Sequence, residues 1–335
     1  MLWCVQWDAD ANADFECWPE DIRNQECMYR ITEAPDGGLV VSGNSSHNFD
    51  DYYLAKLFPD CQSREDYDPV IAAAVMATPD RSYTVGVNES WTTDKKIHGT
   101  IVIPDGHQLT IGSGAVIRFA DSRLLAHPTR IIVEAGGKLN ITSSAVLTSL
   151  PGCNGQNAMW DGIILRGIPG YPQEPLATTD QGFARLRDCT SEHARSAISV
   201  DEIMLTNESM AIAEQNASGG IVIADNAIFR NNIRDVFFSP FENHQGDYPN
   251  GLYGIEENKS RFRTCTFENT AQLNDPYQRP QAHATLFGVR GVRFQGCTFT
   301  GGVYPMLDAF DNTVLTDQYM GQGIKSIMST FAVEA

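Results

Sequence analysis

The sequence predicts an all-β chain folded as a right-handed parallel β-helix, with a small N-terminal β segment. Glycine, asparagine and strand-forming residues are frequent among the 335 residues, and no long stretch shows the spacing of an amphipathic helix. Two repeated patterns also run along the chain. Units of this kind can bury their inward faces only by stacking on one another, which is the principle of a solenoid.

The first repeat is regular. Residues 101–111 align with residues 131–141 at an offset of 30 (131 − 101), which places Leu109 over Leu139. Each unit reads as a strand, a glycine turn, a second strand, a short turn and a third strand. Apolar residues alternate along the strands, so we expect one face of each strand to point into a shared core.

The second repeat has unequal spacing but keeps one strand pattern, in which an arginine and an apolar residue precede a cysteine. Its cysteines are Cys189, Cys265 and Cys297, and Ala227 takes the same position in a fourth copy. Stacking in register predicts that these side chains form one inward column of small buried groups. Metal ligation is the weaker interpretation, because Ala227 interrupts the column and no histidine joins it.

The chain divides at about residue 85. Residues 1–85 are expected to hold a hairpin over residues 29–44, a further strand over residues 51–57, and a linker that is either a short helix or a strand. Residues 86–335 are expected to form the parallel β-helix. We also expect the β-helix to continue beyond residue 335, because the strand pattern is still running there.

Charge limits the classes of partner. The chain has 24 lysines and arginines against 42 aspartates and glutamates, a formal net charge of −18. Such a surface repels phosphates, so nucleic acid is not an expected partner. A solvated acidic surface explains the charge best; no cofactor is expected, although loose Ca²⁺ capture stays open. No apolar run reaches about 18 residues, so no membrane span is expected, and no signal peptide is visible.

A family resemblance is carried by residues 99–106, the Leu-x-Ile element that begins at Leu109, the Trp-x-Gly-Ile element that begins at Trp160, and residues 219–222. From about residue 91 the chain resembles the right-handed, pectin-lyase-like β-helix repeats of large exported surface proteins in Bacteroidetes-type bacteria. The resemblance implies a secreted or cell-surface location, further domains in a longer chain, and glycans or surface proteins as partners. Residues 36–57 resemble, more weakly, one repeat of a surface β-propeller.

The sequence offers few candidate site residues and no catalytic signature. Trp160 beside Asp161 could stack on a sugar ring, although packing between coils explains the tryptophan better. Asp247, Tyr248 and Tyr253 form a second candidate binding patch in a polar loop. Paired carboxylates would be needed for glycoside hydrolysis, and the aspartates of the coils stand singly.

Two functions are therefore expected. The first is a structural or adhesive module that presents loops to glycans or proteins on a rigid stack. The alternative is a carbohydrate-active enzyme, a polysaccharide lyase or glycoside hydrolase, which the fold alone suggests. An enzyme should bring several acidic or basic side chains together in one place.

Overall fold

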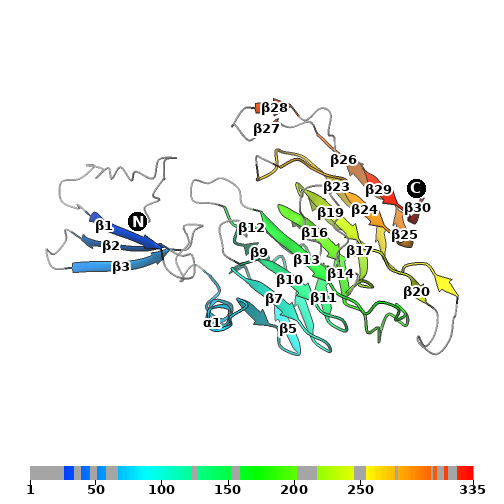
Figure 1. Ribbon diagram of the computed structural model, residues 1–335, viewed down its shortest axis with the longest axis horizontal. Coiled ribbons are helices and arrows are strands. Elements are labelled where there is room, and N and C mark those ends of the chain that lie inside the picture. The colour runs from blue at the N-terminus through cyan, green and yellow to red at the C-terminus, as the bar shows by residue number, and fades with distance from the viewer. Residues whose placement is uncertain are drawn as a thin grey trace.

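The computed structural model describes residues 26–33, 39–45, 51–57, 67–121, 127–151, 159–201, 217–244, 254–275, 278–302, 305–307, 313–315 and 323–334. From residue 82 onward the chain passes in turn through three parallel sheets, contributing one strand to each sheet in almost every coil. The coils follow one another along the long axis of the molecule (Figure 1). This arrangement confirms the prediction of an all-β parallel solenoid.

Each sheet is named here by its order along a coil. Sheet 1 contains β4 (Ser82–Thr84), β7 (Thr100–Ile103), β10 (Arg130–Val133), β13 (Trp160–Leu165), β16 (Ala194–Val200), β19 (Arg234–Phe238), β24 (Ala284–Phe287) and β29 (Ile324–Ile327). Sheet 2 contains β5 (Asn88–Trp91), β8 (Gln108–Ile111), β11 (Lys138–Ile141), β14 (Phe183–Arg187), β17 (Ile221–Asp225), β22 (Arg261–Arg263), β25 (Arg290–Gln295) and β30 (Thr330–Glu334). Sheet 3 contains β6 (Lys95–Ile97), β9 (Val116–Phe119), β12 (Val146–Ser149), β15 (Thr190–Glu192), β18 (Ile228–Arg230), β23 (Thr266–Glu268) and β26 (Thr298–Thr300).

The register between coils follows the repeats seen in the sequence. Leu139 pairs with Leu109 between β11 and β8, as the offset of 30 predicts. Phe262 pairs with Phe294 between β22 and β25, which places the second repeat in register as well. Equivalent positions therefore stack on one another along the solenoid, with register shifts between β13 and β16 and between β25 and β30.

Stacked side chains fill the interior. The rings of Phe267 and Phe299 lie 4.7 Å apart between centroids and nearly parallel, and those of Phe262 and Phe294 lie 5.0 Å apart. The predicted cysteine column is confirmed: Cys189, Cys265 and Ala227 are buried and Cys297 is half-buried. Burial raises the pKa of the Cys189 thiol to about 12, so this cysteine behaves as an inert core group.

A helix covers the first coil. Helix α1 (Pro69–Ala77) begins at the N-cap residue Asp68, whose carboxylate accepts hydrogen bonds from the backbone N–H groups of Val70 and Ile71 at 3.2 and 3.0 Å. Buried Ile71 and Val75 of α1 belong to the same apolar cluster as the coil interior. The linker is therefore a helix. The first coil begins earlier than the expected boundary at residue 86, because β4 already pairs with β7.

The N-terminal β segment is an antiparallel meander. Strands β1 (Glu26–Glu33) and β2 (Leu39–Ser45) form the hairpin expected over residues 29–44, and β3 (Asp51–Leu57) pairs with β2. Two small hairpins also leave the coils. Strands β20 (Asn243–His244) and β21 (Ile255–Glu256) lie between sheets 1 and 2, and β27 (Pro305–Leu307) and β28 (Thr313–Leu315) lie between sheets 3 and 1.

Candidate functional site

Turn length singles out one face of the solenoid. The turns from sheet 2 to sheet 3 are short, and most turn on one or two residues with positive φ, such as Asp188 (49°), Asn226 (52°) and Thr264 (49°). Long connections, such as residues 166–182 and 269–283, instead lead out of or into sheet 1 on its two sides. The outer face of sheet 1 thus lies beside long turns, and several of its outward side chains, such as Ile164 and Phe237, are buried.

A row of polar and small residues crosses this face. Arg130, Gly162, Ser196 and Arg234 pair in succession across β10, β13, β16 and β19. Adjacent parallel strands lie about 4.8 Å apart, so the two arginines stand about 14 Å apart with the small residues between them. A Cβ atom at Gly162 would lie 1.7 Å from the Ser196 carbonyl oxygen, so only glycine fits there.

Arg234 is the most perturbed group on this face. Its guanidinium lies over the Phe237 ring, 5.0 Å from the centroid, and donates a hydrogen bond to the Gln281 side chain. Burial lowers the pKa of Arg234 to about 10. Within the described residues no carboxylate pairs with it and its Nε lacks a hydrogen-bond partner. A half-buried cation of this kind is a candidate for holding an anionic ligand.

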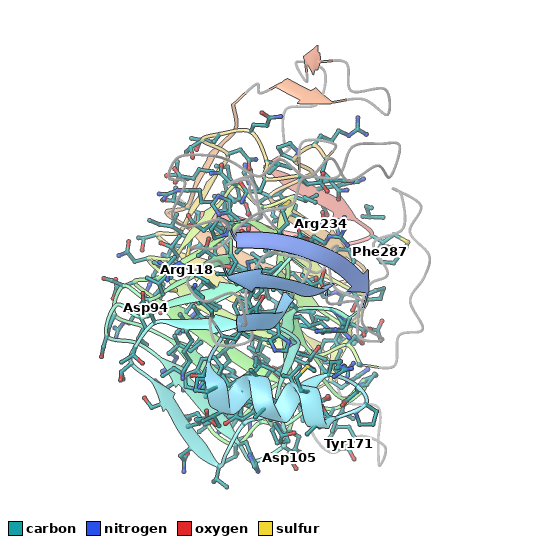
Figure 2. All side chains as sticks on the ribbon, turned by 90° about the vertical axis from the view of Figure 1, so that its left-hand side faces the viewer. Asp94, Asp105, Arg118, Tyr171, Arg234 and Phe287 are labelled. Carbon is teal, nitrogen blue, oxygen red and sulfur yellow. The ribbon has the colours of Figure 1, made fainter. Side chains whose placement is uncertain are left out.

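Figure 2 looks at the molecule from the end that carries α1. Arg234 and Phe287 lie on one side of the coils, and Asp94 and Arg118 lie on the opposite side. Arg234 and Phe287 belong to strands β19 and β24, which are neighbours in sheet 1. The cation and the half-buried aromatic ring therefore share the sheet 1 face.

Asp161 also lies at this face, as a member of an ion pair. Its Oδ1 atom stands 3.9 Å from a guanidinium nitrogen of Arg195, and its side chain is 20% exposed. Nearby, the Ser199 hydroxyl donates to the Ser196 hydroxyl at 2.9 Å. The candidate Asp161 thus lies beside a cation and near hydroxyls, groups of the kind that can hydrogen-bond sugar hydroxyls or carboxylates.

Trp160 is not a ligand-binding residue. Its side chain is fully buried, its ring stacks on Phe119 at 4.3 Å between centroids, and its Nε1 donates to the Glu192 carbonyl at 2.9 Å. The sugar-stacking interpretation is therefore wrong and the packing interpretation is confirmed. Alternation along β13 is the physical reason, since Trp160 points inward.

The second predicted patch cannot be placed. Asp247, Tyr248 and Tyr253 lie outside the described residues. Within the described residues, no three His, Cys, Asp or Glu side chains gather as a group that could hold a metal ion. No described helix is long and apolar enough to cross a membrane.

Sequence reasoning missed Arg130, Arg195 and Arg234. Its candidates were aspartates and aromatic residues, and it named no arginine as a site residue. The signal available was register: the offset of 30 places Arg130 level with Thr100, at the start of a sheet 1 strand. Comparisons with family models, curated proteins and solved structures return no match for this chain.

Proposed function

We propose that this chain is a structural and adhesive β-solenoid module of a secreted or cell-surface protein, linked to other domains, which presents the outer face of sheet 1 to glycans or proteins. We take the coil as right-handed and pectin-lyase-like, because parallel crossover connections are right-handed in about 98% of cases. A rigid stack of this kind holds its turns in fixed positions, which lowers the entropic cost of binding.

The observation that carries the proposal is the outer face of sheet 1. Half-buried Arg234, its stacking partner Phe237 and the Asp161–Arg195 ion pair lie there beside long turns. The repeat pattern of an exported surface protein adds to it, as a resemblance carried by residues such as 99–106 and 219–222.

Binding to an array of glycans, with and without Ca²⁺, tests the proposal. We expect wild-type protein to bind at least one glycan class, and Arg234→Gln to lose most of that binding. Arg118→Gln removes a charge from the opposite side of the coils and serves as the matched control. The proposal is contradicted if the wild-type protein binds neither a glycan nor a surface protein, or if the Arg234→Gln variant binds as well as the wild-type protein.

A carbohydrate-active enzyme is the second candidate. The lowered pKa of Arg234, on the face that also carries Asp161, favours it, because perturbed ionisable groups gather at active sites. A reducing-end assay on the same glycans separates the two functions. If the wild-type protein releases new reducing ends from a glycan and the Arg234→Gln variant does not, the chain is an enzyme rather than an adhesive module.

A further inference from the structure

The outer face of sheet 2 carries a concentration of cations. Six exposed arginines, named here the arginine face, are Arg185, Arg187, Arg261, Arg263, Arg290 and Arg293. They alternate with inward apolar residues such as Leu186 and Phe262, so the pleat directs them to the surface. In Figure 2 this sheet runs between the turns that carry Asp105 and Asp94.

The arginine face is rich in cations, although the chain as a whole has more acidic than basic residues. The eight strands of sheet 2 hold seven cationic side chains and three carboxylates. The whole chain has 24 cationic residues against 42 acidic ones. Cations are therefore gathered on this face while the excess of acid lies elsewhere, which creates a local field of opposite sign to the net charge.

Most of these arginines lack an acidic partner. Asp225 binds Arg263 at 2.7 Å, and Glu257 binds Arg293. In the part of the chain that the structure describes, Arg185, Arg187, Arg261 and Arg290 pair with no carboxylate; Arg185 instead lies 5.8 Å from the centroid of the Phe183 ring. Four guanidinium forks are thus open to an external anion.

Stacking brings these charges close together. Arg261 and Arg293 are direct register partners on β22 and β25, about 4.8 Å apart along the solenoid axis. Arg185 lies two coils from Arg261, since Ile223 of β17 separates them in the register. Like charges at opposed positions oppose folding, so this arrangement needs a compensating role.

We propose that the arginine face binds a linear anionic polysaccharide, with carboxylate or sulfate groups on successive sugars, laid along the solenoid axis. The planar guanidinium matches carboxylate and sulfate oxygens with two parallel hydrogen bonds. The spacing of the coils is similar to the length of one sugar ring, so acidic sugars can meet the arginines of β14, β22 and β25, whereas the intervening strand β17 offers buried Ile223 and Asp225 instead of an arginine. This surface is separate from the sheet 1 face, and the inference stands whether or not sheet 1 binds a ligand.

Other polyanions fit the face less well. A nucleic acid carries charge around its whole circumference and would also meet the acidic remainder of the surface. Single strands gain much of their affinity from stacking on exposed aromatic rings, whereas Phe183 beside the arginines is 6% exposed.

The test is a binding titration in EDTA, so that no Ca²⁺ can bridge two acidic partners. Polygalacturonate and dextran sulfate are the probes, neutral dextran is the blank, and polyglutamate and a single-stranded oligonucleotide are competing polyanions. The test variant combines Arg185→Gln, Arg187→Gln and Arg261→Gln. The control combines Lys96→Gln, Arg118→Gln and Lys325→Gln, which removes the same charge from sheets 3 and 1.

We expect the test variant to bind the two acidic polysaccharides at least about tenfold more weakly, and the control to change by less than about twofold. Equal weakening in both variants would reduce the effect to net charge and overturn the proposal. Tighter binding of polyglutamate or of the oligonucleotide than of either polysaccharide would overturn the choice of partner. Circular dichroism of each variant confirms that exposed substitutions leave the fold intact.

Discussion

Sheets 2 and 3 share one interior and one coil spacing, yet one outward column of sheet 2 and one of sheet 3 use charge in opposite ways. On sheet 3, Glu192, Arg230 and Glu268 stack in direct register with alternating sign. Arg230 Nε lies 2.6 Å from the Glu268 carboxylate, and a second guanidinium nitrogen lies 3.8 Å from Glu192. On sheet 2, Arg261 stacks directly on Arg293, whereas the neighbouring column of Arg187, Asp225 and Arg263 alternates in sign.

The difference teaches what a stack in register does to charge. Each outward position is repeated at about 4.8 Å, so opposite charges form a stabilising ladder and like charges form a concentrated field. The column of Glu192, Arg230 and Glu268 therefore holds the coils of sheet 3 together, while Lys96 and Arg118 stack as like charges at its first coil. The stacked pair of Arg261 and Arg293 lowers the stability of the fold slightly, and this loss is explained if the two charges bind an external anion.

The largest expected effect comes from the interior that both faces share. Phe262 beneath sheet 2 is fully buried, and its ring lies 5.8 Å from that of Phe267 beneath sheet 3. Phe262→Ala should lower the free energy of unfolding by about 3–5 kcal/mol, because it removes an aromatic ring and leaves a cavity. Chemical denaturation measures the change.

Phe331→Ala is the matched control for that experiment. Phe331 occupies an inward position of the last coil but is 39% exposed. It should lose clearly less stability, because water already reaches its ring. Equal losses of unfolding free energy in Phe262→Ala and Phe331→Ala would contradict the role of the stacked interior in stabilising sheets 2 and 3.

The contrast between buried and exposed positions also shows how far the sequence could predict the molecule. The offset of 30 predicted the pairing of Leu109 with Leu139, and the repeated cysteines predicted an inward column. Both predictions rest on alternation and in-register stacking, which are local properties of the strands. The helix α1 was left open, because nine residues without clear amphipathic spacing suit a strand equally well.

The candidate sites were harder to predict, for physical reasons. The sequence shows directly that Arg185 and Arg187 flank Leu186. Whether a carboxylate neutralises these arginines depends on residues of other coils or turns, such as Asp225. Arg234 looks like any surface arginine in the sequence, and only its burial beside Phe237 changes its pKa. Long turns bring such groups together, and their course is not encoded in a repeat.

The second prediction breaks the ladder of sheet 3. Arg230→Glu would place three carboxylates in register at adjacent coils, in place of two ion pairs. We expect a loss of about 1–2 kcal/mol in the free energy of unfolding, since lost attraction and new repulsion add. High salt should reduce the loss, because it screens these partly exposed charges. A salt-independent loss would point to packing of the arginine stem instead.

The third prediction places a carboxylate in the column of Arg261 and Arg293 on sheet 2, so that its charges alternate as they do around Arg230 on sheet 3. Arg261→Glu places a carboxylate opposite Arg293, so a repulsive pair becomes an attractive one. Stability should rise by about 0.2–1 kcal/mol, while affinity for dextran sulfate should fall. Thermal unfolding and a binding titration on the same sample check the two signs. A rise or a fall in both quantities together would break the proposed opposition between stability and binding on this face.

The smallest expected effect concerns Glu257, which neutralises one member of the arginine face. Its hydrogen bond with Arg293 holds the pKa of Glu257 below its ordinary value. The pair therefore stabilises the fold above the unfolded-state pKa of about 4.3, and this contribution is lost as pH falls through the lowered folded-state pKa. Both groups are exposed, so the effect on stability should be slight.

Binding should respond more clearly than stability. Glu257→Gln frees the Arg293 guanidinium, so at pH 7 we expect affinity for dextran sulfate to rise about two- to fivefold. Sulfate stays ionised at low pH, so acidification to below the lowered pKa of Glu257 should free Arg293 in the wild-type protein as well and make the affinities of the two proteins equal. A gap in affinity that persists at low pH would show that Glu257 acts on the ligand by some means other than its charge, and Arg293 would then lose its place among the anion-binding residues.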